Sequence, residues 1–444
     1  MNKVVIVAGG MGTRMGKLSE STPKSLMRAG DKPIISYQIE NLKKYGLRDI
    51  ILVVNHLGGA IKEYCGDGKR FGVNISYFEE QKPLGTAGGI KLLKRKLGDD
   101  FVVVYGDILF NIDFRALLAQ HYQNKKAIKN HVGTLVVHPN NHPLDSDLVD
   151  ISENGRILNF LSKPHAPDLC FRNLVNAALY VLTSKVHRYI PTGEKTDFGK
   201  DIFPKILAKK GALFAYHTPE YTRDMGTPER LNEGLNDIKS GLFKQSSLRT
   251  KRPAIFLDRD GVINKEVGNL RRAEDFILLP NAAKAIRKIN QTGYYAVVIS
   301  NQPVVAKGFC TMDELLEINK KMETLLGIEG AKLDAVYFCP HHPDKGFPGE
   351  NKKYKVVCGC RKPKTGMIQN AKKNFNIDLK RSIMVGESTR DSRLAENLGI
   401  KFFGVKTGEA LKDNKYELKK KPKVYKDLFA VVNAVIKNKH QSKT

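Results

Sequence analysis

The 444-residue sequence has no tryptophan, only six cysteines, and no apolar run of the roughly 18 residues that cross a bilayer. Its first apolar stretch, in "MNKVVIVAGG", is broken by glycines too soon for a signal peptide. These absences predict a cytoplasmic protein with no membrane partner. Cysteines in that compartment are metal ligands or core residues more often than disulfides.

Acidic residues are also scarce, because 46 Asp and Glu face 74 Lys and Arg, a net charge of +28. This balance favours polyanionic partners, either nucleic acid or small phosphorylated molecules, although much of it is explained by a solvated, lysine-rich surface. Proteins that bind single strands usually interleave aromatic and basic side chains, and no such stripe is present. We therefore expect phosphorylated small molecules and no nucleic-acid partner.

The chain is long enough for two or three domains. Strand-like runs at 4–8, 50–54 and 101–105 alternate with helix-like stretches at 34–45 and 89–97, as in a parallel sheet covered by helices.

The alternation stops near residue 240, in the polar and basic stretch "SGLFKQSSLRTKRP". A second series begins with "AIFLD" at residue 254 and ends in the apolar-periodic "KDLFAVVNAVIKN", without any internal repeat. We predict two different, doubly wound α/β domains at 1–240 and 253–436, joined by a linker at 241–252 and followed by a basic tail at 437–444.

A glycine-rich loop, "AGGMGTRMG", follows the first predicted strand. Gly9, Gly10 and Gly12 let successive backbone N–H groups turn toward a phosphate, although a tight turn without a ligand remains an alternative. The dinucleotide fingerprint and the Walker A pattern both fail here. Arg14 and Lys24 place positive charge near the loop, as a bound triphosphate requires.

Two carboxylates occur at predicted loop edges of the same half. Asp107 ends "FVVVYGD", and Asp224 lies in "YTRDMGTPERL". Together they could share a Mg²⁺ that screens charge at a reacting phosphate, and each alone could equally be a helix cap or a turn residue. A second glycine-containing loop, "EEQKPLGTAGG", suits backbone recognition of a base edge.

The first half resembles the sugar-phosphate nucleotidylyltransferases over residues 2–236. The resemblance rests on "VAGGMGTRMGKLSESTPKSLM", "PLGTAGG", "YGD", "VNAALYVL" and "RDMGTPERL", which occur in the expected order. This family has a Rossmann-like fold, joins a sugar 1-phosphate to an NTP and releases pyrophosphate.

The resemblance implies roles for individual residues. Arg14 would hold the triphosphate, Lys24, Lys163 and Asn176 would lie on the sugar-phosphate side, Gly85 and Thr86 would face the base, and Asp107 with Asp224 would bind Mg²⁺. The family often has Glu-Lys-Pro where this chain has Ser162-Lys163-Pro164, so a carboxylate that would hold a sugar hydroxyl is missing.

In the second half, "AIFLDRDGVIN" puts Asp258 and Asp260 at the carboxyl end of an apolar strand, where open α/β sheets bind ligands. One carboxylate, oriented by Mg²⁺, can attack phosphorus, while the other protonates the leaving oxygen and then activates water. The ligand spacing of a Ca²⁺ loop is absent.

The ends of later predicted strands, and the loops between them, supply the other groups that this reaction needs. Ser300 and Asn301 can hydrogen-bond phosphoryl oxygens, Lys362 can offset their charge, and Glu387 with Asp391 can complete the Mg²⁺ site.

This order of motifs resembles the haloacid dehalogenase (HAD)-type phosphatases over residues 253–436. The last motif of these phosphatases usually reads Gly-Asp, whereas Glu387 stands there in this chain.

Three of the six cysteines lie between residues 339 and 360. Cys339-x-His341 and Cys358-x-Cys360 are 19 residues apart and offer the four ligands that tetrahedral zinc prefers. A site closed by four protein ligands predicts a structural zinc, which would position Lys362 two residues beyond. Cys65, Cys170 and Cys310 are expected to be ordinary core or surface residues.

The zinc loop, "CPHHP" and "CRKPKTGM" resemble one subgroup, the heptose 1,7-bisphosphate 7-phosphatases, with histidinol-phosphate phosphatases as relatives. Arg361 and Lys362 of "CRKP" would bind substrate. No large cap domain is present, so substrate choice would depend on short loops such as 267–275, where Arg271 and Arg272 could bind a second phosphate.

Together, the resemblances imply consecutive steps of NDP-heptose synthesis, with guanine as the expected base and phosphosugars and NTP as partners, in a chain that could form oligomers. Mg²⁺ in both domains and structural Zn²⁺ are the expected cofactors. Alternatives are a nucleic-acid end-processing enzyme, a histidinol-phosphate phosphatase joined to a hexose-1-phosphate nucleotidyltransferase, and a regulatory module with inactive sites.

Overall fold

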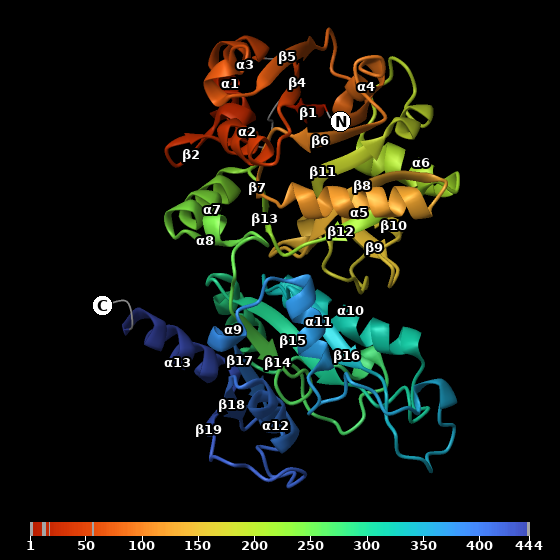
Figure 1. Cartoon of the computed structure of the whole chain (residues 1–444), viewed down its shortest axis with the longest axis vertical. Coiled ribbons are helices and arrows are strands. Elements are labelled where there is room, and N and C mark those ends of the chain that lie inside the picture. Colours follow the sequence, from red (N-terminus) through yellow and green to blue (C-terminus); the bar gives the residue numbers. More distant parts are fainter. Residues whose placement is uncertain (1–2, 11–14, 17, 56, 442–444) are drawn as a thin grey trace. The chain divides into compact units, whose positions relative to one another are not determined.

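The computed structural model describes residues 3–10, 15–16, 18–55 and 57–441 (Figure 1). Contacts within the chain form two compact units. The first unit comprises Met1–His138, Asp145–His165 and Leu174–Leu248, and the second comprises Pro139–Leu144, Ala166–Asn173 and Arg249–Thr444. Both units are α/β, which confirms the predicted fold class.

The first unit is built on a nine-stranded mixed sheet whose main path runs β10-β9-β11-β6-β1-β4-β5. Its parallel centre follows from β-branched runs such as "DIILVV" and "DFVVVY", which are apolar on both faces. The strands of this sheet are β1 (Val4–Val7), β4 (Asp49–Val54), β5 (Asn74–Glu79), β6 (Asp100–Tyr105), β8 (His131–His138), β9 (Leu148–Ile151), β10 (Ile157–Leu161), β11 (Val175–Thr183) and β12 (Ala212–His217).

Helices cover both faces of this sheet, and β1 shows why. Val4 and Ile6 belong to one apolar core, whereas Val5 belongs to the other. The helices of this unit up to residue 239 are α1 (Leu18–Ser21), α2 (Ile34–Lys44), α3 (Gly58–Cys65), α4 (Gly85–Leu92), α5 (Phe114–Ala127), α6 (Phe203–Ala208) and α7 (Pro228–Lys239). Of these, α7 packs against the small strands β2 and β13. The helix expected at 89–97 begins earlier, at Gly85, and ends at Leu92.

Two small antiparallel ladders accompany the sheet. One pairs β2 (Arg28–Ala29) with β3 (Lys32–Pro33), and the other pairs β7 (Ile108–Asn111) with β13 (Tyr221–Asp224). In the second ladder Asp224 lies opposite Ile108. Two segments more than a hundred residues apart in sequence are thereby brought together.

The stretch predicted as a linker contains a short helix, α8 (Leu242–Gln245). The ring of Phe243 packs edge-on against Tyr37 and Tyr221, and the Tyr221 N–H donates to the Ser246 carbonyl at 2.8 Å. Apolar contacts of this kind hold the segment on the first unit.

The second unit has a six-stranded, fully parallel sheet in the order β16-β15-β14-β17-β18-β19. Strand order reverses beside β14, which makes a crevice at the carboxyl ends of β14, β15 and β17. The strands are β14 (Ala254–Leu257), β15 (Tyr295–Asn301), β16 (Ala335–Cys339), β17 (Ile383–Gly386), β18 (Lys401–Val405) and β19 (Lys423–Tyr425), and the helices are α9 (Ala282–Asn290), α10 (Met312–Ile328), α11 (Gly366–Asn374), α12 (Thr389–Leu398) and α13 (Leu428–Gln441).

Two segments from the first half of the sequence pack within the second unit. The Phe171 N–H donates to Thr324 Oγ1 at 2.8 Å, and the Asn173 N–H donates to Glu323 Oε2 at 2.9 Å. Both acceptors lie on α10. No pattern in the sequence predicts these contacts.

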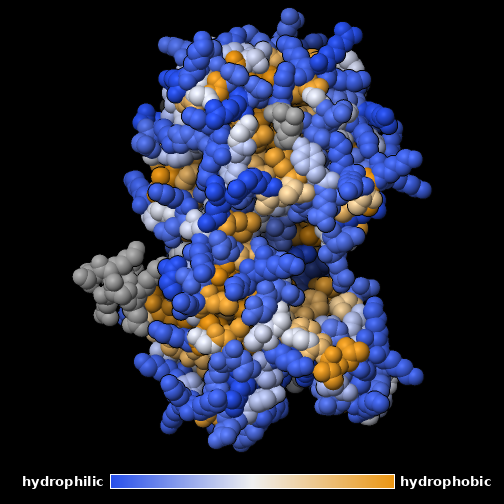
Figure 2. Space-filling view, in the orientation of Figure 1, coloured by the Kyte–Doolittle hydropathy of each residue, from blue (hydrophilic) through white to orange (hydrophobic). Residues whose placement is uncertain are grey.

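Hydrophilic residues cover most of the face shown in Figure 2, with apolar residues in smaller groups between them. Within the described part of the chain, no helix has the length and apolar character needed to span a membrane.

Candidate active sites

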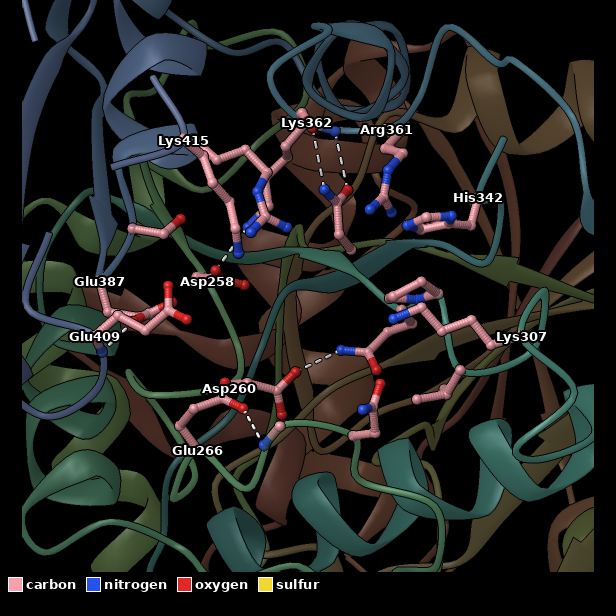
Figure 3. A pocket seen from close by; sticks show the side chains of 18 of the residues that line it. Asp258, Asp260, Glu266, Lys307, His342, Arg361, Lys362, Glu387, Glu409 and Lys415 are labelled. Atoms are coloured by element: carbon pink, nitrogen blue, oxygen red, sulfur yellow. Dashed lines mark hydrogen bonds and ion pairs between the residues drawn. The ribbon is translucent and has the colours of Figure 1, made fainter. Parts of the chain in front are cut away.

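The crevice of the second unit opens into a cleft of about 560 Å³ (Figure 3). Asp258 follows β14, Asn301 ends β15, and Glu387 follows β17. Lys362 reaches the cleft from the loop before α11. The parallel sheet therefore gathers residues that are scattered along the sequence, because its strand ends meet at one edge.

Lys362 lies at the centre of this site. Its Nζ is 2.8 Å from Asp258 Oδ2 and 2.7 Å from Asp391 Oδ1, and the Lys362 and Asp391 side chains are at most 1% exposed. The backbone of Lys362 is held by Asn301, which donates through Nδ2 to its carbonyl at 3.1 Å and accepts its N–H at 2.9 Å. Asn301 thus clamps the backbone of Lys362, and because it also lines the cleft, its contact with phosphoryl oxygens stays a prediction.

Asp260 is held by three side chains that sequence reasoning missed. Arg259 Nη2, Asn264 Nδ2 and Gln302 Nε2 donate to its carboxylate at 3.0, 2.9 and 2.6 Å. Burial raises the pKa of Asp260, but the Arg259 charge and these hydrogen bonds outweigh it and lower that pKa. Gln302 also donates to Ser300 Oγ at 2.8 Å. In the sequence, these partners could have been found only from their positions inside the motifs "DRDGVIN" and "SNQ".

Three carboxylates form a candidate metal site. The ligand atoms of Asp258, Glu387 and Asp391 lie within 4.8 Å of one another. Burial and the charge of Asp391 raise the pKa of Asp258 to about 7, and burial and the charge of Asp258 raise the pKa of Glu387 to about 8. A divalent cation would offset this repulsion, so the group fits Mg²⁺. Asp260, a predicted ligand, is not part of this group.

The four predicted zinc ligands are close together. Their sulfurs are 3.2 Å apart for Cys360–Cys339 and Cys360–Cys358 and 3.5 Å for Cys339–Cys358, and His341 Nδ1 is 3.4 Å from Cys360 Sγ. Tetrahedral zinc with Zn–S bonds of about 2.3 Å needs ligand atoms roughly 3.4 to 3.8 Å apart. The separations of 3.5 and 3.4 Å fall in this range, and the two of 3.2 Å are slightly shorter. The donor set therefore fits that metal, with two sulfur pairs slightly closer than a bound zinc would hold them.

The two arginines proposed to bind a second phosphate are placed elsewhere. The Arg271 guanidinium lies 4.2 Å from the centre of the Phe309 ring, and Arg272 pairs with Asp275. Neither lines the cleft, which is lined instead by six other basic side chains: Lys307, His342, Arg361, Lys362, Arg390 and Lys415.

The first unit contains two charged pairs at neighbouring carboxylates. Lys24 Nζ lies 3.3 Å from Asp107 Oδ2, and Arg230 Nη1 lies 2.6 Å from Asp224 Oδ2. Asp107 and Asp224 are neighbours because β13 pairs with β7. Burial and the Asp224 charge raise the pKa of Asp107. This arrangement brings the two predicted Mg²⁺ ligands close to Lys24, which was predicted to lie on the sugar-phosphate side.

The glycine loop itself is only partly described. A Cβ on Gly9 would lie 3.0 Å from Asn55 Cβ, whereas one on Gly10 would meet no atom within 4 Å. Gly12 and Arg14 lie outside the described residues.

The beginning of α4 is locked to a neighbouring loop. Gly85 has φ +74°, and a Cβ there would lie 2.4 Å from the Thr196 carbonyl oxygen. Thr86 Oγ1 donates to Asp197 Oδ2 at 2.7 Å and accepts the Phe198 N–H at 2.9 Å. The side chain of Thr86 therefore positions the loop, and only backbone groups remain for the predicted contact with a base.

The predicted sugar-side residues converge on one loop. Lys163 Nζ pairs with Asp145 Oδ1 at 2.7 Å, and the Lys163 N–H donates to Asp147 Oδ1 at 3.3 Å. The Asn176 N–H donates to the Asp147 carbonyl at 3.0 Å. Asp145 also pairs with Arg230, so alternating charges connect Lys163 to Asp224. Sequence reasoning missed Asp145, Asp147 and Arg230.

Comparison with known proteins matches both halves. The "Nucleotidyl transferase" family model matches residues 3–241, and the HAD-hydrolase-like family model matches residues 359–430. The chain is 31% identical over 250 residues to a mannose-1-phosphate guanylyltransferase of Mycobacterium tuberculosis, covering 56% of this chain and 67% of that protein.

Two further relatives match the second and the first half of the chain. The chain is 38% identical to a D-glycero-D-manno-heptose-1,7-bisphosphate 7-phosphatase of Thermosynechococcus vestitus, covering 41% of this chain and 94% of that protein. It is 33% identical to a UTP–glucose-1-phosphate uridylyltransferase of Synechocystis sp., covering 62% of this chain and 75% of that protein.

Proposed function

Because this chain belongs to the nucleotidyl transferase family through its first half and to the HAD-type phosphatases through its second, we propose that it carries out two consecutive steps of NDP-heptose synthesis. The phosphatase removes the 7-phosphate of D-glycero-D-manno-heptose 1,7-bisphosphate. The nucleotidyltransferase then joins the resulting heptose 1-phosphate to an NTP and releases pyrophosphate.

The observation that carries the phosphatase assignment is the buried lysine between two carboxylates. In this proposal Asp258 acts as the nucleophile, and Lys362, 2.8 Å away, offsets the charge of the phosphoryl group beside it. Asp260, kept as a carboxylate by Arg259, is suited to accept a proton from water in the second half of the reaction.

The metals have distinct tasks in this proposal. Asp258, Glu387 and Asp391 would hold Mg²⁺ in the phosphatase, and Asp107 with Asp224 would hold it in the transferase, where it supplies charge stabilisation at phosphorus. Zinc would be held by Cys339, His341, Cys358 and Cys360. Since all four positions come from protein, this metal would brace the loop that carries Lys362.

Two relatives bear on the identity of the base. One relative is a guanylyltransferase and another a uridylyltransferase. We take guanine as the base and GTP as the donor, in line with the expectation from the sequence.

The proposal is tested by incubating the protein with heptose 1,7-bisphosphate, Mg²⁺ and each NTP in turn, and following phosphorus species by ³¹P NMR. Orthophosphate should appear first, and pyrophosphate should follow with one NTP. Absence of orthophosphate from any sugar bisphosphate would overturn the pathway assignment.

A further inference from the structure

Asp147, in the loop before β9, is held by only one oxygen of its carboxylate. Its Oδ1 accepts the Lys163 N–H at 3.3 Å, and its backbone carbonyl accepts the Asn176 N–H at 3.0 Å. Among the described residues, no hydrogen bond or ion pair reaches Asp147 Oδ2. The side chain is partly exposed. Its position is therefore fixed by neighbouring backbone, while Oδ2 keeps its capacity to accept hydrogen bonds.

Asn176, near the start of β11, offers the complementary group. Its Oδ1 accepts the Ala178 N–H at 3.2 Å, and its Nδ2 donates to the Tyr180 hydroxyl at 3.1 Å. These two contacts fix the orientation of the amide, and they use one of the two hydrogens on Nδ2. The ladder between β11 and β8 shifts register between Asn176 and Tyr180, an irregularity of the kind that re-aims side chains.

The two groups converge at Gly199. A Cβ on Gly199 would lie 3.4 Å from Asp147 Oδ2 and 3.7 Å from Asn176 Nδ2. Asp197 Oδ1 lies 3.3 Å from the same point, but it already accepts the N–H groups of Gly199 and Lys200. An acceptor and a donor thus lie within 4 Å of a common point. A hydroxyl group, which both donates and accepts, satisfies such a pair.

Ion pairs connect this point to the reacting end of the transferase. Lys163, whose N–H holds Asp147, pairs with Asp145, which pairs in turn with Arg230 and so with the predicted Mg²⁺ ligand Asp224. Both cations are therefore engaged by Asp145. Of the two carboxylates in this loop, it is Asp147 that has an oxygen left for a ligand.

We propose that Asp147, with Asn176, binds a ring hydroxyl of the sugar 1-phosphate that the first unit nucleotidylates. The hydroxyl donates to Asp147 Oδ2 and accepts from Asn176 Nδ2, so sugars without a hydroxyl at that ring position are rejected. This inference rests on the proposed nucleotidyl transfer and deepens it, because it assigns the choice of sugar to named residues. Asp147 thereby supplies a carboxylate that the segment Ser162-Lys163-Pro164 lacks.

The experiment measures kcat and KM for pyrophosphate release by the full-length chain with heptose, mannose and glucose 1-phosphates and the NTP that the wild type uses best. Asp147→Asn keeps the size of the side chain and removes its charge. For the best sugar 1-phosphate, it should raise KM by about 10- to 100-fold, as expected for a lost charge-assisted hydrogen bond. The KM for the NTP should change less than about 2-fold, because the base and triphosphate are bound elsewhere.

Analogues of the best sugar 1-phosphate that each lack one ring hydroxyl identify the bound group. The analogue without that hydroxyl should be a poor substrate of the wild type, and Asp147→Asn should not make it poorer. The other analogues should lose as much as the parent sugar. A purely structural role of Asp147 predicts a different pattern, in which every analogue loses equally.

Asp150→Asn is the matched control, since Asp150 lies on β9, in register with Asn159 of β10. It should leave all KM values unchanged, and unfolding midpoints show that each variant is folded. Equal losses on every analogue, an equal rise in the KM for the NTP, or no loss in Asp147→Asn would overturn the hydroxyl contact. A wild type that uses mannose or glucose 1-phosphate but not the heptose would overturn the proposed substrate and leave the test of Asp147 standing. Use of none of the three sugars would overturn both.

Discussion

The two units handle the same kind of charged pair differently. In the second unit, the side chain of Lys362 is 1% exposed between Asp258 and Asp391, which are 12% and 0% exposed. In the first unit, Lys24 and Asp107 are 14% and 23% exposed, and Asp224 is paired separately with Arg230. In the second unit one lysine joins two nearly buried carboxylates, whereas in the first unit two separate cations hold two partly exposed carboxylates.

The difference follows from how each site is built. Most of the phosphatase residues follow strands of one parallel sheet, where hydrogen bonding between strands sets their spacing. The transferase residues come from the short 3-10 helix that begins at Lys24, a two-stranded ladder and the helix α7. A site made from separate small pieces depends more on its ligand for its final geometry.

The largest expected effect comes from removing one carboxylate from each site, which tests whether the two sites act independently. Asp258→Asn should lower orthophosphate release by about 10³-fold or more, because it removes the proposed nucleophile, and leave pyrophosphate release unchanged. Asp107→Ala should do the reverse. Both products are measured on the same preparation, and a parallel loss of both from either substitution would contradict independent sites.

Removing a zinc ligand should act on the second unit alone. Cys358→Ser should lower bound zinc from one per chain and reduce the unfolding midpoint of that unit by about 5 to 10 °C, as expected when a loop loses a few kcal/mol of metal binding. Zinc content by mass spectrometry and calorimetry measure both effects. Cys310→Ser, outside the cluster, is the control, and an equal effect there would contradict the zinc assignment.

The acidic cluster predicts a pH dependence of stability in the metal-free protein. The pKa values of Asp258 and Glu387 are raised to about 7 and about 8, so the folded state holds these protons more tightly than the unfolded chain. Their contribution is complete below the unfolded values near pH 4 and is lost as pH rises through 7 and 8.

Mg²⁺ should reverse that loss, so it should raise the unfolding midpoint more at pH 8.5 than at pH 5.5, by several degrees. Thermal melts with and without Mg²⁺ in an Asp107→Ala background isolate the second unit. A Mg²⁺ effect independent of pH would contradict this account.

The smallest expected effect concerns the start of α4. Gly85→Ala meets both a positive φ and the Thr196 carbonyl, so it should destabilise the first unit by about 2 to 4 kcal/mol and slow nucleotidyl transfer but not phosphate release. Gly46 has φ +79° with no atom within 4 Å of a Cβ, so Gly46→Ala measures the backbone cost alone. Equal unfolding midpoints for the two variants would exclude the steric clash.

Much of the fold was predictable because apolar runs and glycine loops are local signals. The strands at 4–8, 50–54 and 101–105 appear within one residue of their predicted bounds. The residues of the phosphatase cleft that sit at strand ends were also recognisable, since each follows an apolar run.

Partners supplied by distant segments were not predictable. Arg230 reaches Asp224 and Asp145 from α7, and Thr389 fixes the segment around Lys415 through Asp413. No spacing in the chain marks these pairs, because they depend on how loops return to the sheet.

By itself, the sequence determined the two α/β units, the families they belong to, and the carboxylates and cysteines of the candidate sites, since each of these depends on residues close together in the chain. Only the tertiary structure decided that Asn301 clamps the backbone of Lys362, that Arg259 holds Asp260, and that Arg271 and Arg272 lie outside the cleft. These contacts join side chains whose distance in space is set by packing.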